Sequence, residues 1–404
     1  MKRLLIFVTT VIFIAGCGKV TIKENRDIYI AHLDDAVKIS EMKMSDIFKG
    51  VKTIILQTNP QCLVSEINKL QIEDDMIFIL DNYKGLGLFQ FDGNGIFIRR
   101  IGNIGNGPGE YKSPDDFAID FTNGIIFILD RQKQLVNRYK LEDGKYISSF
   151  ANGDKTKVQF MHLCSVGGRL YADAYYPNAE AGDKVLLREI DPVNGKQIGK
   201  GFLSANKDRR GYVGVNNIIA PTPFANNGND KAYYIDRYMN ELYTLTAREI
   251  KPYFMVESNE FINPENIEEL NTFPQFPPTA AMDYLTGIDK YEELEKYYET
   301  NRYIIFNVTG SGMRKSYNFC YDKEQRSVSS YTRMVADIFY ADPIGTYIPY
   351  PKYRVPNGWY FSLPAMFVKM YLMENKFTEN LDKIDNLRNI DENNNPVIFF
   401  FEYK

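Results

Sequence analysis

One short phrase recurs six times along this chain of 404 residues, and it constrains the fold more than any other feature of the sequence. Each copy combines apolar and aromatic residues with a small polar residue at or near its end. Such runs, bounded by Gly, Asn and Asp, are typical of β-strands and turns. The six copies are MIFILD (76–81), IIFILD (125–130), RLYADA (169–174), KAYYID (231–236), RYIIFN (302–307) and GWYFSL (358–363).

The spacing of these copies indicates a repeating unit of several short strands. Equivalent positions lie 43 to 71 residues apart, and hairpin turns such as Asp92-Gly93-Asn94-Gly95 follow the early copies. Gly and Asn tolerate the positive φ that such turns need. A period of about 40 to 50 residues with several strands each is the signature of a propeller blade. The chain is therefore predicted to be all-β, with a six-bladed β-propeller over residues 28–404.

Helical periodicity is confined to two places, which are predicted to be small helical insertions in the propeller. The first covers about 263–300, where Asn263-Pro264-Glu265 is typical of a helix start. We expect it to cover the propeller; the alternative is a solvated loop decoration. The second is a helix at about 378–390 near the C-terminus. The apolar stripes are Ile288, Tyr291, Leu294 and Tyr298 in the first insertion and Leu381, Ile384, Leu387 and Ile390 in the second.

The two ends of the propeller are expected to meet. Residues 397–401 form a continuous apolar strand, which needs cover on both faces. A propeller ring must close, because open strand edges promote aggregation. The C-terminal strand is therefore predicted to share a blade with residues 50–58, GVKTIILQT, from the N-terminal end.

The N-terminus has the pattern of a secretory signal. A basic pair precedes an apolar run that is too short to span a bilayer, and the run ends in Ile14-Ala15-Gly16-Cys17. This ending is typical of a lipoprotein signal that is cut before the cysteine. The alternative is an ordinary signal peptide with a chance cysteine. We expect residues 1–16 to be removed, Cys17 to be lipidated and residues 17–27 to form a linker.

The charge balance argues against a nucleic-acid partner. The formal net charge is −4, and it falls to −6 without the two basic residues of the signal segment. A nucleic-acid-binding surface needs a basic field. The remaining cysteines and the histidines are few and scattered: Cys62, Cys164, Cys320, His32 and His162. Neither a disulfide framework nor a zinc or multi-histidine metal site is therefore predicted.

A glycine-rich stretch at 101–120, IGNIGNGPGEYKSPDDFAID, raises the question of phosphate binding. Its spacing fits neither GxGxxG nor a P-loop, and a strand pattern rather than a helix follows it. Nucleotide binding is therefore not expected, and the stretch is predicted to connect two blades. Its polar residues either face the central channel or cap turns, and turn capping is favoured. These candidates are Glu110, Tyr111, Asp115 and Asp116.

Two further sets of residues are candidates for ligand contact. The first is a ring of carboxylates at equivalent strand ends, which suits a divalent cation, although such residues also accept hydrogen bonds from turn amides. Its members are Asp81, Asp130 and Asp236. The second is the irregular, tyrosine-rich loop 342–360, whose rings are suited to stacking on sugars or peptides. Its candidates are Tyr347, Tyr350 and Tyr353.

These motifs together resemble a known protein family. The lipobox, the stretch 101–120, the phrase IFILD followed by FDGNGIFIRRIG, and the ending NNNPVIFFFEYK are similar to those of six-bladed β-propeller lipoproteins of Bacteroides-type bacteria. Those proteins are similar in layout to NHL-repeat propellers. The resemblance covers most of residues 28–404. It implies a fold and an envelope location, and it transfers no catalytic residues.

The expected function is that of a lipid-anchored binding or scaffold module of the cell envelope, at the outer membrane. A glycan, peptide or protein is the expected partner. The sequence contains no coherent catalytic set, and no cofactor is expected beyond an optional divalent cation. The alternative is a hydrolase or lyase that acts on a glycan or peptide at the central channel through Asp, Glu or Tyr side chains.

Overall fold

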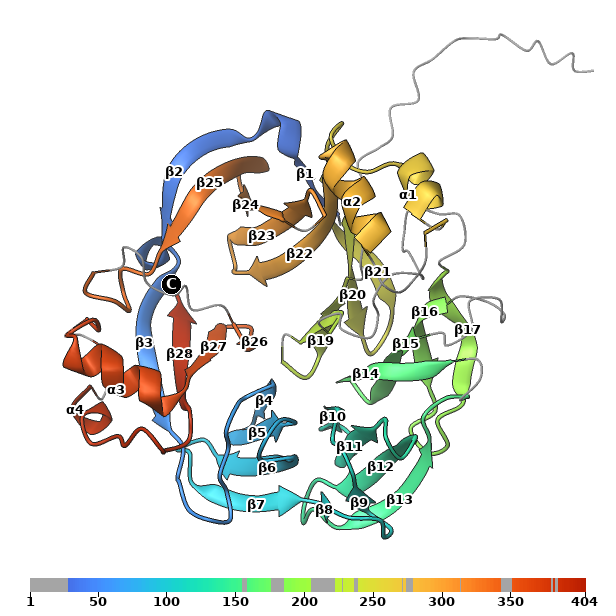
Figure 1. Cartoon of the computed structure of the whole chain (residues 1–404), viewed down its shortest axis with the longest axis vertical. Coiled ribbons are helices and arrows are strands. Elements are labelled where there is room, and N and C mark those ends of the chain that lie inside the picture. The colour runs from blue at the N-terminus through green and yellow to red at the C-terminus, as the bar shows by residue number, and fades with distance from the viewer. Residues whose placement is uncertain are drawn as a thin grey trace, which may run out of the picture.

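The computed structural model describes residues 28–404 apart from short internal gaps. The gaps are 155–157, 176–184, 205–221, 227, 236–238, 271, 274–278, 313, 343–350, 379–380 and 382–383. In the described part of the chain, six sheets of four or five strands stand around a common axis like the blades of a propeller (Figure 1). This arrangement confirms the all-β, six-bladed prediction. The predicted signal segment 1–16, Cys17 and the linker lie outside the described residues.

The first three blades are four-stranded antiparallel sheets that follow one another along the chain. Blade 1 consists of β4 (Lys69–Glu73), β5 (Met76–Asp81), β6 (Gly87–Asp92) and β7 (Phe97–Ile101). Blade 2 consists of β10 (Asp116–Asp120), β11 (Ile125–Asp130), β12 (Leu135–Lys140) and β13 (Tyr146–Ala151). Blade 3 consists of β14 (Gln159–Val166), β15 (Arg169–Tyr175), β16 (Val185–Ile190) and β17 (Gln197–Ser204).

The other three blades each take their outermost strand from the N-terminal segment. Blade 4 consists of β18 (Phe224–Asn226), β19 (Lys231–Tyr234), β20 (Glu241–Thr246), β21 (Ile250–Glu257) and β1 (Tyr29–His32). Blade 5 consists of β22 (Tyr291–Glu299), β23 (Tyr303–Gly310), β24 (Lys315–Asp322), β25 (Ser327–Val335) and β2 (Val37–Lys43). Blade 6 consists of β26 (Tyr353–Val355), β27 (Gly358–Leu363), β28 (Val397–Tyr403) and β3 (Phe48–Ile55).

The recurring phrase occupies the same place in every blade. Each copy forms the second strand from the centre, namely β5, β11, β15, β19, β23 and β27. Blades cover such a strand on both faces, so its side chains are buried in succession; β5 and β11 each have five buried residues in a row. The repeat therefore marks the blades correctly.

The N-terminal segment forms a belt around half of the ring (Figure 1). Its strands β1 and β2 add in parallel to the outer edges of blades 4 and 5, and short 3-10 helices at Leu33–Asp35 and Met44–Asp46 turn the chain between blades. The third strand, β3, pairs antiparallel with β28 along its whole length. The predicted pairing of the two chain ends is thus confirmed, and the belt before it is a feature that the sequence did not indicate.

The glycine-rich stretch connects the outer strand of blade 1 to the inner strand of blade 2. It contains two short parallel strands, β8 (Asn103–Ile104) and β9 (Glu110–Tyr111). Gly102 has a φ of 66°, and a Cβ there would lie 2.7 Å from Tyr111 Cε1 and Tyr139 Oη. Only glycine adopts this positive φ and avoids these close contacts without strain. The predicted blade connection is confirmed.

The stretch 291–299, predicted to be helical, is the innermost strand of blade 5, β22, so that part of the prediction is wrong. The strand pairs with β23 but shifts register between Tyr291 and Glu293 and again between Leu294 and Lys296. Each bulge breaks the alternation of side chains along the strand. Apolar residues then recur at intervals of three and four, which imitates the period of a helix.

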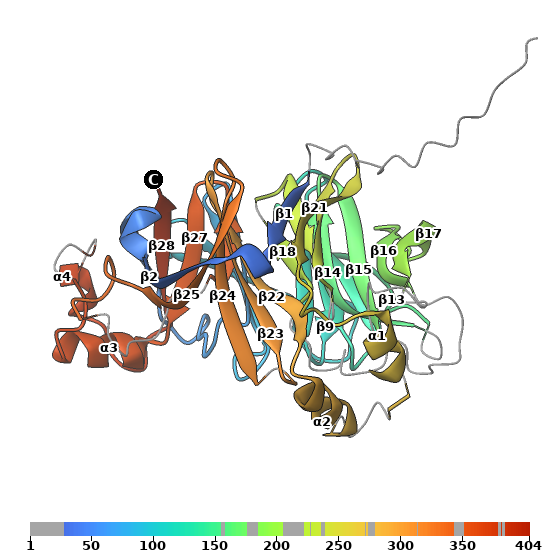
Figure 2. The ribbon, with the colours of Figure 1, turned by 90° about the horizontal axis from the view of Figure 1, so that it is seen from above.

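Four helices occur in the described residues, all inserted between strands: α1 (Pro264–Leu270), α2 (Thr279–Ile288), α3 (Ala365–Met373) and α4 (Ile384–Leu387). Ile267 of α1 and Leu285 of α2 join the core around Phe306, so this insertion packs on the propeller rather than standing in solvent. Of the predicted helix at 378–390, the described residues contain the single turn α4. The helix α3 was not predicted. Figure 2 shows α2 and α3 toward the same face of the disc.

None of the helices in the described part of the chain combines the length and the apolar character that a membrane span requires.

Candidate functional site

The six innermost strands surround the axis of the propeller, and a cavity of about 280 Å³ lies among four of them. Blades 1, 4, 5 and 6 contribute its walls through β4, β18, β22 and β26. We call it the channel pocket. The residues that define it here are Lys69, Phe224, Lys296, Tyr297, Tyr298, Lys352, Tyr353 and Arg354, with Glu295 as the acidic member.

Strand alternation sends the two tyrosines of β22 to opposite sides. Tyr297 packs toward blade 4, where its ring centroid lies 4.9 Å from that of Tyr233. Tyr298 packs toward blade 6, 5.2 Å from the ring of Trp359, and the Arg354 guanidinium stands 5.1 Å from the Tyr298 ring. Burial raises the pKa of Tyr297 well above its ordinary value, and Glu299 adds to this effect. Tyr297 therefore stays neutral, and both tyrosines contribute aromatic walls to the pocket.

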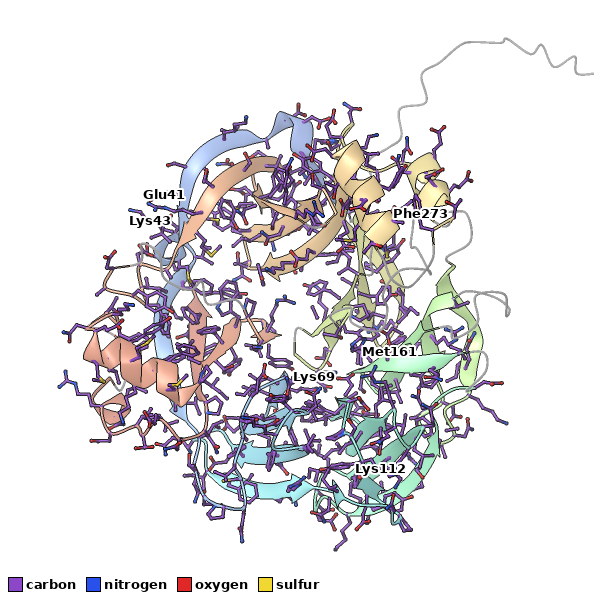
Figure 3. The ribbon with its side chains drawn as sticks, viewed as in Figure 1. Glu41, Lys43, Lys69, Lys112, Met161 and Phe273 are labelled. Carbon is purple, nitrogen blue, oxygen red and sulfur yellow. The ribbon has the colours of Figure 1, made fainter. Side chains whose placement is uncertain are left out.

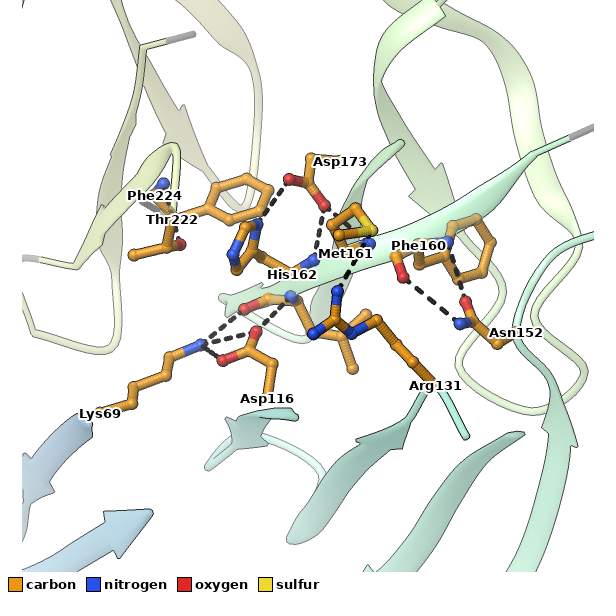
Figure 4. Close-up of polar contacts among 11 residues, drawn as sticks. Lys69, Asp116, Arg131, Asn152, Phe160, Met161, His162, Asp173, Thr222 and Phe224 are labelled. Carbon is orange, nitrogen blue, oxygen red and sulfur yellow. Dashed lines mark hydrogen bonds and ion pairs between the residues drawn. The ribbon is translucent and has the colours of Figure 1, made fainter. Parts of the chain in front are cut away.

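A buried polar network joins the pocket to blades 2 and 3 (Figure 4). The Lys69 ammonium donates to both carboxylate oxygens of Asp116, at 2.8 and 3.0 Å, and to two backbone carbonyls, one of which is that of Leu163. The Leu163 amide in turn donates to Asp116 Oδ2 at 2.6 Å. Figure 3 shows Lys69 near the centre of the ring. One ion pair thus ties together the inner strands of three blades.

His162 lies next to this network on β14. Its Nδ1 is 2.6 Å from Asp173 Oδ2, and Asp173 also accepts a hydrogen bond from the Met161 amide (Figure 4). Burial alone would lower the pKa of His162, but the Asp173 carboxylate, with help from Asp116, raises it above the ordinary value. Asp173 therefore fixes the orientation of the imidazole and favours its charged form.

A second cavity of about 410 Å³ has the opposite charge. We call it the acidic pocket and define it by Glu73, Asp74, Asp75 and Asp230. Glu73 ends β4, whereas Lys69 begins it, so these two residues lie about 13 Å apart along that strand. Burial raises the pKa of Glu73, and Asp74 and Asp230 raise it further by repulsion.

Among the residues singled out from the sequence, Tyr353 and Asp116 lie on inner strands. Tyr353 lines the channel pocket, and Asp116 is the carboxylate that holds Lys69. Tyr347 and Tyr350 lie outside the described residues.

The other candidates of the glycine-rich stretch stabilise the chain locally. The Gly107 amide donates to Glu110 Oε2 at 2.7 Å, and the buried Tyr111 donates its hydroxyl hydrogen to the Ile101 carbonyl. Their strand β9 lies beside β8, away from the axis (Figure 1). Asp115 accepts hydrogen bonds from the backbone and side chain of Arg131. The structure does not bring these three residues to the channel pocket.

The recurring aspartates cap turns. Asp81 accepts hydrogen bonds from the amides of Ser65, Tyr83 and Lys84, and Asp130 accepts them from Lys112 and Lys133. Asp236 lies outside the described residues. No group of three or more His, Cys, Asp and Glu side chains is placed to hold a metal ion in the part of the chain that the structure describes. Cys62, Cys164 and Cys320 are buried and form no disulfide with one another in the described part of the chain.

Sequence reasoning missed most of the channel pocket. Lys69, Lys296 and Arg354 come from three inner strands that are distant in sequence, and lysine and arginine are common residues. The usable signal was positional, because the strand that precedes each copy of the recurring phrase is the innermost strand of its blade. Residues on those strands are the ones that face the channel.

One known protein family matches this chain. The model of the family described as "Domain of unknown function (DUF4934)" matches residues 28–402, almost the whole described chain. The chain belongs to the DUF4934 family. No curated protein matches it.

One solved structure supports the fold of this DUF4934 chain. The chain is similar to a crystal structure of a candidate exported protein from Bacteroides fragilis, with a TM-score of 0.67 and 16% identity over 94% of this chain and 99% of that one. A member of the DUF4221 family from Bacteroides vulgatus has a TM-score of 0.48 and 10% identity, over 88% of this chain and 97% of that one. At such low identity the first similarity carries the fold alone.

Proposed function

We propose that this chain is a lipid-anchored protein of the bacterial cell envelope that binds a small ligand in the channel pocket. The observation that carries the proposal is the pocket itself, a concave site on rigid inner strands with aromatic walls and a few polar groups. Its one acidic member, Glu295, has no second carboxylate beside it among the residues that line the cavity. Paired carboxylates are the usual machinery of glycan hydrolysis, so this lining favours binding over catalysis.

The location rests on the N-terminal signal pattern and on the similarity to an exported Bacteroides protein fold. Acylation at Cys17 is tested by metabolic labelling with a fatty acid and by fractionation of cells. We expect the wild-type protein to be labelled and to fractionate with the outer membrane, whereas Cys17→Ala should be unlabelled and released from membranes. A labelled Cys17→Ala protein would contradict lipid anchoring at this residue.

Ligand binding is tested on the soluble form from residue 18 onward. A metabolite and glycan library is screened by thermal shift, and each hit is measured again with Tyr298→Ala, which removes a wall of the channel pocket. The matched control is Tyr83→Ala, because Tyr83 is 65% exposed and lies outside the pocket. We expect hits that Tyr298→Ala abolishes and Tyr83→Ala leaves unchanged. Hits that are insensitive to Tyr298→Ala would contradict the site, and turnover of a hit would favour the hydrolase or lyase alternative.

A further inference from the structure

The channel pocket carries a marked excess of positive charge. Four of its lining residues are basic, namely Lys69, Lys296, Lys352 and Arg354, and one is acidic. The acidic pocket at the other end of β4 has four carboxylates and no basic residue in its lining. Concave sites with one sign of charge concentrate ligands of the opposite sign. An anion is therefore drawn to the channel pocket and repelled from the acidic one.

The basic residues differ in how far the protein itself neutralises them. Lys69 is held by Asp116 and by two carbonyls, so its hydrogen-bonding capacity is used. The Lys296 ammonium lies 3.9 Å from Oε1 of Glu295. Arg354 has no ion pair with any described residue, and its Nε is buried without a hydrogen-bond partner in that part of the chain. Among the described residues, Arg354 and the exposed Lys352 are thus the pocket cations without an ion pair, and Arg354 is the more buried of the two.

The same arginine lies against an aromatic wall. Its guanidinium is 5.1 Å from the ring of Tyr298, on a strand that is neighboured by the exposed Lys352. A planar guanidinium binds carboxylates through paired hydrogen bonds and also stacks on aromatic faces. Tyr298 is only 3% exposed, so its ring supports Arg354 rather than the ligand. The volume of about 280 Å³ lies at the lower limit of small-molecule sites, which restricts the ligand to about one ring.

We infer that the channel pocket binds a carboxylate carried on a single ring, with Arg354 as the anion-binding residue and Tyr298 as the aromatic side chain that holds the guanidinium in place. This inference rests on the proposed binding function. Two sources supply this chemistry, a uronic acid and an aromatic carboxylate. In both, the carboxylate accepts hydrogen bonds from Arg354, which Tyr298 holds in place, and Lys352 adds attraction at the exposed side.

The test uses matched pairs of compounds that differ in charge. The soluble protein from residue 18 onward is titrated calorimetrically with glucuronate against glucose, and with 4-hydroxybenzoate against 4-hydroxybenzyl alcohol. We expect at least one acid to bind about tenfold or more tightly than its neutral partner, because a charge-assisted hydrogen bond is worth at least that factor. The pair that responds identifies the source as a saccharide or an aromatic acid. Equal affinity within each pair, or binding of no compound, would overturn the inference.

Single substitutions test which side chain binds the acid. Arg354→Gln should weaken the binding of the acid about tenfold or more and leave the affinity for the neutral compound unchanged. Lys352→Gln, at an exposed position, should weaken it less and should leave the free energy of unfolding unchanged. The control is Arg333→Gln, which removes a charge that is paired with Glu41 on the surface. An equal effect of Arg333→Gln would contradict the assignment.

The two proposals fail in different ways. If library hits are lost with Tyr298→Ala but are neutral molecules that ignore Arg354→Gln, the anion inference is wrong and the binding function stands. If acids bind and Tyr298→Ala has no effect on them, the channel pocket is not the site, and both proposals are wrong.

Discussion

At the scale of single residues, the centre of the propeller is organised by buried charge. Lys69, Asp116, His162 and Asp173 lie on or beside the innermost strands of blades 1 to 3, and each is satisfied by a neighbour from another strand. In the channel pocket, Arg354 and Lys352 have no ion pair with any described residue. A ligand therefore meets a rigid, already paired wall on one side and an unpaired cation on the other.

The ion pair between Lys69 and Asp116 should be essential for stability. Asp116→Asn leaves the partly buried ammonium without its counter-charge, and we expect the free energy of unfolding in urea to fall by about 3 kcal/mol. The side chain of Asp116 is 4% exposed, so water cannot replace the carboxylate. Asp143→Asn, at a surface pair with Lys145, should leave the unfolding midpoint unchanged. Similar losses in the two variants would contradict this account.

His162 should make stability depend on pH. Its pKa in the folded protein lies above the ordinary value, because Asp173 and Asp116 outweigh burial and Lys69. The stabilisation that charged His162 contributes is therefore complete at a pH below the ordinary histidine pKa. It is lost as the pH rises through the pKa of His162 in the folded protein. The free-energy difference between wild type and His162→Gln, measured from pH 5 to 8, should shrink with increasing pH. In an Asp173→Asn background most of this trend should vanish, whereas a difference that grows with pH would contradict the charge assignment.

At the scale of elements, two glycines show how a strained connection between blades differs from an ordinary helix surface. Gly102 in the connection between blades 1 and 2 has a positive φ and tyrosine atoms at 2.7 Å from a Cβ, whereas Gly287 in α2 has open space around it. Gly102→Ala should therefore lower the free energy of unfolding by about 1–3 kcal/mol. Gly287→Ala should raise it by about 0.5–1 kcal/mol, because alanine is the better helix former. Two shifts of the same sign in urea unfolding would contradict this distinction.

Whether an element can be predicted from the sequence depends on how deeply its side chains are buried. The second strand of each blade is buried on both faces, so its apolar run is visible in the sequence, and all six were found. The belt strand β2 is mostly exposed and carries little apolar signal, with Val37 62% exposed. The bulges of β22 gave its residues a helical spacing. A strand can thus be predicted from the sequence where its side chains are buried. It cannot be predicted where only backbone pairing with a neighbouring strand defines it.

At the scale of the whole molecule, the fold depends on the joint between its two ends. Phe399 of β28 is fully buried among aromatic rings that include Phe339 and Phe361, and β28 holds β3 in blade 6. Phe399→Ala should lower the free energy of unfolding by about 3–5 kcal/mol. Met373→Ala, at a residue that is 77% exposed, is the control and should change it little. A loss no larger than that of the control would argue against blade 6 as the joint that holds the ring.

The candidate site is a property of the whole molecule, which limits what its sequence reveals. The walls come from four blades, and Lys69 and Arg354 are 285 positions apart in the chain. Only Tyr353 was singled out beforehand, through the irregular tyrosine-rich loop that precedes β26. Six blades can be counted from one repeat, but the chemistry of the channel depends on which side chains the ring brings together.

The most direct test is a crystal structure of the protein with the tightest ligand from the paired titrations, collected at saturating concentration. The account predicts ligand density in the channel pocket, with a carboxylate within hydrogen-bonding distance of Arg354. Density at another surface, with an empty channel pocket, would contradict the central claim that the ligand site lies at the centre of the propeller.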